Sequence, residues 1–171
     1  MTEIIKVGDN LPDMAIKAIV KDEIKDAKLS SLFADHSLMH PKDKKIVLFS
    51  VPGAFTPTCS AKHLPGYVNL HNKYKEKGID HIICISVNDP FVMNAWGKEN
   101  NVGDKIVMMG DPFLNFTKDI GADVDKSGRG LGIRSNRYTM YVEDMKVIKL
   151  QEEKDTGSCE ISAAENFLNL V

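Results

Sequence analysis

Cys59 is the residue of this chain best placed to do chemistry, because it stands where a strand-like segment gives way to a helix-like one. The preceding segment, residues 44–51, is apolar and rich in β-branched residues and predicts a buried strand. The following segment, 60–78, predicts a helix. A thiol in the first helical turn lies beside unpaired backbone N–H groups and the positive end of the helix dipole, which favour the nucleophilic thiolate.

A helix terminus alone does not ionise a thiol. Lowering a thiol pKa from about 8.5 to about 6 requires roughly 3.4 kcal/mol of preference for the anion. A helix terminus typically supplies about 0.3–1 kcal/mol and at most about 2. A cation from elsewhere in the chain must contribute the rest. Taken alone, an isolated cysteine is more often a small buried residue than a reactive one, so the neighbours of Cys59 decide between these interpretations.

Length and composition predict a single domain over residues 1–171, since 171 residues with 43% hydrophobic content are enough for one core and too few for two ordinary domains. The net charge of −2, with interleaved signs, argues against nucleic-acid and membrane-surface partners. No apolar stretch approaches a membrane span and no signal sequence is recognisable. The three cysteines, widely spaced and odd in number, fit a reducing intracellular compartment, either the cytoplasm or an organelle reached through a removed presequence.

The order of the predicted elements indicates an α/β fold. Strands are expected at 15–20, 44–51, 80–87 and 105–111, a hairpin at 137–151, a short helical turn at 28–33, a loop of unknown purpose at 34–45, and helices at 60–78, 90–101, 113–120 and 162–170. Asn88, Asp89 and Pro90 form a helix start signal before the second long helix. Alternating strands and helices followed by a hairpin predict a central mixed sheet with helices on both faces.

The segment 51–60, VPGAFTPTCS, carries Pro52, Thr56 and Cys59 in the order P-x3-T-x2-C and resembles the active-site motif of the peroxiredoxins. KHLPGYV, ICISVNDPFVMNAW and RSNRYTMYVED further along resemble the type II, peroxiredoxin-5-like branch, and especially its plant and protozoan members. The likeness extends from about residue 7 to the end. It implies a thioredoxin-like fold and the reduction of hydrogen peroxide and alkyl hydroperoxides in antioxidant defence, with no metal and no bound organic cofactor.

The resemblance also implies a role for each motif residue. Cys59 is expected to be the peroxidatic nucleophile that becomes a sulfenic acid. Thr56 is expected to orient the thiolate and the peroxide, and Arg137, just before the strand that begins at Tyr138, to supply the missing cation. Pro52 is expected to shield Cys59 from water. Without the family these three would be interpreted as a helix cap, a surface charge and a turn proline.

Three further features compete for a role in this site. Arg134 lies close to Arg137 in sequence and is its rival as the cation. His63 follows Cys59 by four residues and shares its helical face, which suggests a metal pair, but two ligands do not make a zinc site and we expect a packing or polar-network role. The glycines in 128–132 faintly resemble a phosphate loop, but they follow no predicted strand and precede no helix, so a flexible loop is expected.

The sequence leaves the recycling of the oxidised cysteine open. Cys84 matches the resolving cysteine of plant type II members, yet its strand position is typical of an inert thiol, and a Cys59–Cys84 disulfide would require local unfolding. Cys159 is a second candidate, although it is two residues out of register with animal members. The third possibility is direct reduction of the sulfenic acid by glutathione with glutaredoxin, which we favour, or by thioredoxin. A homodimer is implied by the resemblance alone.

Two other classes of function were weighed. A thiol-disulfide oxidoreductase requires a CxxC pair, and Ser60, Ala61 and Lys62 follow Cys59 instead. A peroxide sensor or redox relay would use the same cysteine without fast turnover, and the sequence leaves that alternative open.

Overall fold

A computed structural model of the chain describes residues 3–20, 22–28 and 45–171. The expected helical turn at 28–33, apart from Lys28, and the expected loop, apart from Lys45, lie outside the described residues.

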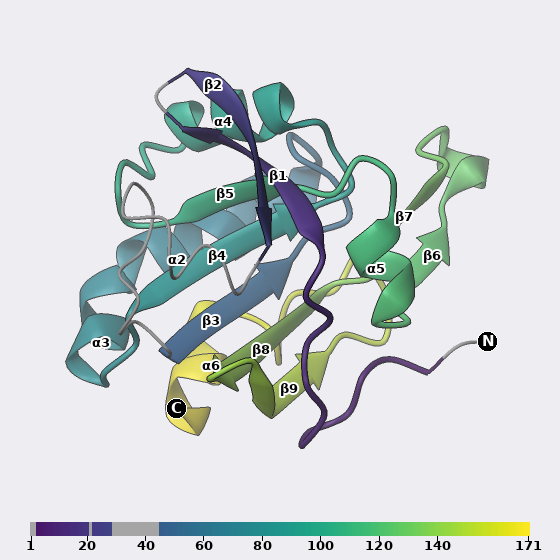
Figure 1. The fold of residues 1–171 in the computed structure, drawn as a ribbon. Coiled ribbons are helices and arrows are strands. Elements are labelled where there is room, and N and C mark those ends of the chain that lie inside the picture. The colour runs from purple at the N-terminus through teal and green to yellow at the C-terminus, as the bar shows by residue number, and fades with distance from the viewer. Residues whose placement is uncertain (1–2, 21, 29–44) are drawn as a thin grey trace.

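The centre of the described structure is a mixed sheet of seven strands in the order β2-β1-β5-β4-β3-β8-β9 (Figure 1). These strands are β1 (Ala15–Val20), β2 (Glu23–Lys28), β3 (Lys45–Ser50), β4 (His81–Ser86), β5 (Val107–Gly110), β8 (Tyr138–Glu143) and β9 (Lys146–Glu152). Strands β3, β4 and β5 are parallel, and the remaining pairs are antiparallel. A second, two-stranded sheet consists of β6 (Asp123–Asp125) and β7 (Ile133–Ser135).

The helices are short, and apart from η2 in the turn of the second sheet they lie about both faces of the central sheet (Figure 1). They are η1 (Cys59–His63), α2 (Leu64–Asn69), α3 (His71–Glu76), α4 (Pro90–Glu99), α5 (Asn115–Asp119), η2 (Ser127–Arg129), α6 (Ala164–Phe167) and η3 (Leu168–Leu170). Asp89 caps α4 as predicted, because its carboxylate accepts a hydrogen bond from the Val92 N–H at 2.9 Å.

Two apolar cores lie on opposite faces of the sheet, since successive side chains of a strand point to opposite sides. Ile46 and Leu48 of β3 belong to a core that includes Phe116 of α5. Val47 and Phe49 belong to the other core, which is built with side chains from α2, α3, α4 and α6: Tyr67, Tyr74, Trp96 and Phe167. The predicted mixed sheet with helices on both faces is confirmed.

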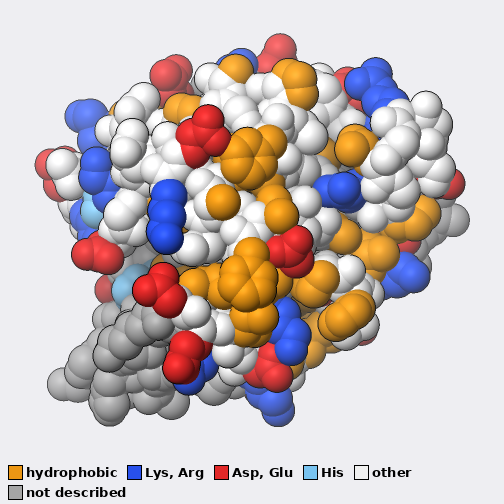
Figure 2. All heavy atoms as spheres, turned by 90° about the horizontal axis from the view of Figure 1, so that it is seen from above, with side chains coloured by type: hydrophobic (Ala, Val, Ile, Leu, Met, Phe, Trp, Pro, Cys, Tyr) orange, Lys and Arg blue, Asp and Glu red, His pale blue; other side chains and the backbone are white. Residues whose placement is uncertain are grey.

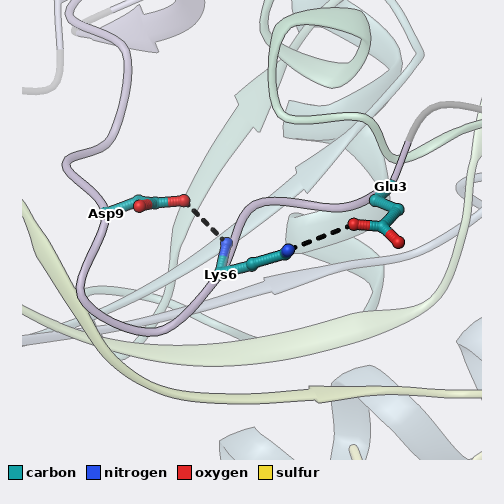
Figure 3. Close-up of polar contacts among 3 residues, drawn as sticks. All are labelled: Glu3, Lys6 and Asp9. Carbon is teal, nitrogen blue, oxygen red and sulfur yellow. Dashed lines mark hydrogen bonds and ion pairs between the residues drawn. The ribbon is translucent and has the colours of Figure 1, made fainter.

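The segment before β1 closes the outer edge of β9. The Gly8 N–H donates to the Val147 carbonyl at 2.8 Å, and the Val147 N–H donates to the Asp9 carbonyl at 2.9 Å. Lys6 contributes locally: its ammonium lies 3.2 Å from the Glu3 carboxylate and its backbone N–H donates to Asp9 Oδ2 at 3.1 Å (Figure 3). The ion pair is exposed and contributes little, so the backbone bonds hold this segment in place.

Three sequence-based expectations need correction. The helix expected at 60–78 is divided into η1, α2 and α3, and β2, β6 and β7 were missed because each is short or exposed. The loop at 128–132 does follow a strand, since it joins β6 to β7. None of the described helices is both long and apolar enough to cross a membrane.

Candidate active site

Cys59 lies at the carboxyl end of β3, after a loop that begins at Val51. The helix starts at residues 57–58 and its segment η1 is π-helical, because the Leu64 N–H donates to the Cys59 carbonyl, one residue further back than in an α-helix. The Cys59 side chain is fully buried. The predicted position in the first helical turn is therefore confirmed, although the turn is not α-helical.

Arg137 reaches the Cys59 sulfur directly, with Nη2 donating to Sγ at 3.2 Å. The sheet explains this contact: β8 pairs with β3 so that Tyr138 faces Ser50, which places the residue before Tyr138 beside the start of the Cys59 loop. The Arg137 side chain is 1% exposed, so its positive charge acts on the sulfur with little screening by water. This contact places a cation at the sulfur, which a helix terminus alone would need in order to ionise the thiol.

The guanidinium of Arg137 is fixed by two further contacts. Nη1 lies 2.9 Å from His63 Nδ1, and Nη2 also donates to the Thr156 carbonyl at 3.0 Å. His63 Nε2 lies 3.2 Å from the Ser162 carbonyl, which can only accept, so Nε2 carries the proton and Nδ1 accepts from Arg137. Burial, and then the charge of Arg137, hold the pKa of His63 well below its usual value. His63 is thus neutral and part of a polar network.

Pro52 and Thr56 line a pocket of about 340 Å³ that leads to Arg137. Its other lining residues come from the helix start, the β6–β7 turn and a loop after β9: Pro57, Thr58, Lys126, Arg129, Leu131, Thr156 and Gly157. The Thr56 hydroxyl donates to the Gly53 carbonyl at 2.6 Å, so its proton is committed to the loop and its oxygen remains an acceptor. A role for Thr56 as a donor would require this bond to break.

Arg134 supports the same loop from another side. Its Nε donates to the Leu131 carbonyl at 2.8 Å, and Nη1 donates to the carbonyls of Val87 at 3.1 Å and Pro52 at 3.5 Å. Of the two arginines weighed from the sequence, Arg137 contacts the sulfur and Arg134 contacts backbone carbonyls.

All three cysteines are free and buried. Cys84 lies in β4, paired with Phe49 on one side and Met108 on the other. Burial, and then electrostatic interaction with Cys59, raise the pKa of Cys84 well above its usual value. Burial also raises the pKa of Cys159, which is 3% exposed, although Arg137 opposes this effect. Both candidate resolving thiols are therefore protonated in the reduced protein.

Sequence reasoning missed the loop that follows β9. Glu153 Oε1 accepts hydrogen bonds from the Glu160 N–H at 2.6 Å, the Ser162 N–H at 2.9 Å and the Ser162 hydroxyl at 2.8 Å. These bonds position the carbonyls of Thr156 and Ser162, which hold Arg137 and His63. A backbone carbonyl leaves no signature in a sequence, and the burial of Glu153 is visible only in the structure.

Comparisons with known proteins agree with this geometry. A sequence profile of the redoxin family matches residues 6–168. The chain is 41% identical to peroxiredoxin-2B of Arabidopsis thaliana over 165 residues, which is 96% of each chain. Reduced Prx3 of Vibrio vulnificus, crystallised with hydrogen peroxide, matches with a TM-score of 0.87 and 41% identity over 98% of this chain and 99% of that one. The Plasmodium falciparum antioxidant protein, a 1-Cys peroxiredoxin, matches with a TM-score of 0.86 and 32% identity over 97% and 98%.

These matches span nearly the whole chain, and the thiol at the start of a helix with an arginine on its sulfur is the arrangement that a peroxide-reducing cysteine requires. The expected thioredoxin-like fold is confirmed by the same solved structures. The chain belongs to the redoxin family, and within it is a type II peroxiredoxin.

Proposed function

We propose that Cys59 is the peroxidatic nucleophile of this thiol-dependent peroxidase and that Arg137 is its activating cation. The observation that carries the assignment is the 3.2 Å contact between Arg137 Nη2 and Cys59 Sγ inside a buried site. A guanidinium there stabilises the thiolate before the reaction and the charge that moves onto oxygen during it. The Vibrio relative crystallised with hydrogen peroxide supports a peroxide as the substrate.

The first half of the cycle transfers one oxygen atom. The Cys59 thiolate attacks the nearer oxygen of ROOH, the O–O bond breaks with its electron pair leaving on the distal oxygen, and Cys59–SOH and RO⁻ form; RO⁻ then takes a proton to give ROH. Arg137 Nε–H has no acceptor among the described residues, so it is available to donate to the distal oxygen of a bound peroxide. Thr56 accepts the peroxide O–H through its free lone pairs, and Pro52 keeps bulk water from the sulfur.

The second half of the cycle uses an external thiol. Glutathione attacks Cys59–SOH, giving the mixed disulfide and water, and a second thiol, from glutaredoxin or another glutathione, releases Cys59–SH and a disulfide. Thioredoxin is the alternative reductant. The position of Cys84 supports this route, because both edges of β4 are paired and moving the thiol would disrupt the sheet. The Plasmodium relative is a 1-Cys peroxiredoxin, which also fits a cycle without an internal resolving thiol.

A homodimer completes the proposed assembly. Phe55, Phe91 and Phe113 are 50%, 60% and 73% exposed and follow the carboxyl ends of β3, β4 and β5. Their loops are neighbours, since Ala54 N–H donates to Asn88 Oδ1 at 3.0 Å, and a Cβ on Gly110 would lie 2.5 Å from the Asn88 carbonyl. Hydrophobic side chains also gather on the face that carries β2 and α4 (Figure 2). Exposed aromatic groups of this kind are typical of protein interfaces.

The cysteine chemistry fits a reducing intracellular compartment. Relatives named as chloroplastic and mitochondrial occur alongside others whose names give no compartment, so we place the protein in the cytoplasm or in an organelle of this kind.

The deciding test is Cys59→Ser in a coupled assay that follows NADPH consumption with hydrogen peroxide, glutathione, glutaredoxin and glutathione reductase. We expect the wild type to turn over and the variant to show only background. Mass spectrometry of peroxide-treated wild type should find one added oxygen on Cys59. Oxidation of Cys59 without turnover, in this assay and in one coupled to thioredoxin, would replace the peroxidase with the sensor or relay function.

A further inference from the structure

We propose that Lys126 and Arg129 form a carboxylate-binding rim on the active-site pocket, so that the enzyme prefers a reactant that carries a carboxylate. This proposal rests on the peroxidase function above and adds the chemical class of one of its reactants. Both residues line the pocket together with Arg137.

The pocket is much larger than hydrogen peroxide requires. It measures about 340 Å³, whereas one water molecule occupies about 30 Å³ in the liquid and a small organic ligand fills a pocket of about 300–1,000 Å³. Arg137 belongs to the lining and also contacts the Cys59 sulfur at 3.2 Å, so a molecule that fills this pocket has one end beside the guanidinium that holds the reacting atom.

The charges of the pocket select the ligand. Its described lining residues include the cations Lys126, Arg129 and Arg137 and no Asp or Glu. Asp155 is close enough for Lys126 to contribute to lowering its pKa, but the Asp155 oxygens already accept from Gly157 N–H and from the N–H and hydroxyl of Ser158 at 2.9 Å each. Arg137 is committed to the sulfur, which leaves the two rim cations to bind an anionic group.

The rim is held in place by backbone bonds that do not depend on its side chains. Lys126 N–H donates to the Gly132 carbonyl at 2.7 Å, and Arg129 N–H and Leu131 N–H both donate to the Lys126 carbonyl, at 3.0 and 3.2 Å. The positive φ of Gly132, 71°, suits this tight turn. Replacing Lys126 or Arg129 by glutamine therefore removes a charge and keeps the turn.

The carboxylate can belong to either of two reactants, and the experiment separates them. One arm measures the oxidation of Cys59 by linoleic acid hydroperoxide and by its methyl ester. The other arm measures reduction of the sulfenic acid by glutathione and by glutathione diethyl ester. In each arm the ratio of the second-order rate constants for the acid and the ester measures the contribution of the carboxylate. The variants are Lys126→Gln, Arg129→Gln and the double variant, with the exposed Lys98→Gln on α4 as the control for net charge.

We expect each single variant to lower the acid-to-ester ratio about two- to fivefold in at least one arm, as for other exposed ion pairs. The double variant should lower it by roughly tenfold, high salt should lower it in the wild type, and Lys98→Gln should leave it unchanged. The arm that responds identifies the anionic reactant. An unchanged ratio in both arms overturns the proposal, whereas a wild type that hydrogen peroxide does not oxidise refutes the peroxidase function itself.

Discussion

Cys59 and Cys84 belong to the same apolar core and are both completely buried, yet the structure gives their thiols opposite properties. Cys59 lies at a helix start with a guanidinium on its sulfur. Cys84 lies in the middle of a sheet, where burial raises its pKa and the backbone groups on both sides are already paired. The two thiols therefore differ in the fixed donors near the sulfur and not in exposure.

Removing the guanidinium of Arg137 should reduce the difference between the Cys59 and Cys84 thiols more than any other change. We expect Arg137→Met to lower the rate constant for oxidation by hydrogen peroxide roughly 10²–10³-fold, the usual cost of losing a transition-state donor. The rate can be followed by stopped-flow fluorescence of Trp96, the only tryptophan, whose indole N–H donates to Ser60 Oγ at 3.0 Å. Arg134→Met is the matched control, and a loss of equal size in that variant would show that loop support, not contact with sulfur, matters.

Loosening the loop after β9, which positions Arg137, should destabilise the surroundings of Cys59. Burial works to raise the pKa of Glu153, but hydrogen bonds from Ser162 and Glu160 outweigh it and hold the carboxyl ionised. Glu153→Ala leaves these buried groups without their acceptor, so we expect the free energy of unfolding in urea to fall by about 1–3 kcal/mol. Cys84→Ser is the control, because it should leave the Arg137 network intact. If Glu153→Ala oxidised Cys59 at the normal rate, Glu153 would not position Arg137.

Protonation of His63, which holds Arg137 on Cys59, should make the stability of this site depend on pH. Because the folded pKa lies below the unfolded value of about 6.5, the unfolded state binds the extra proton first. Stability is therefore complete above about pH 6.5 and falls as the pH decreases below it, by at most about 1.4 kcal/mol per pH unit from this group. His63→Gln should remove that slope in urea titrations between about pH 7 and 5. His71→Gln, at a less buried site, should remove a smaller part; an equal effect would reject the assignment.

The smallest effect is expected from the thiols that the proposed cycle does not use. Cys84→Ser and Cys159→Ser should each retain most turnover with glutathione and glutaredoxin, changing it by less than about twofold once corrected for folded protein. Total loss in either variant would make that cysteine the resolving thiol.

The sequence sufficed for features that depend on side-chain type and local order. The buried strands β3, β4 and β5 and the Asp89 cap were predicted from the residues themselves, whereas the pairing of Cys59 with Arg137 was implied by the family resemblance. What it could not show depends on backbone alone or on tertiary packing. Asp144 and Met145 make the hairpin turn with φ of 50° and 66°. Methionine rarely adopts a positive φ, so the residue type at 145 did not predict this turn. Likewise, the carbonyls of Thr156 and Ser162 join the site only because the chain folds back after β9.

The π-helical turn at Cys59–His63 contains one residue more than an α-helical turn. An α-helix turns by about 100° and rises about 1.5 Å per residue. If the Leu64 N–H exchanges the Cys59 carbonyl for that of Ser60, the turn loses its extra residue, and the chain before it rotates by about that angle. Such a rotation would carry the sulfur away from Arg137 while the helix beyond Leu64 stayed in place. The thiol would then leave its buried position without unfolding of the helix.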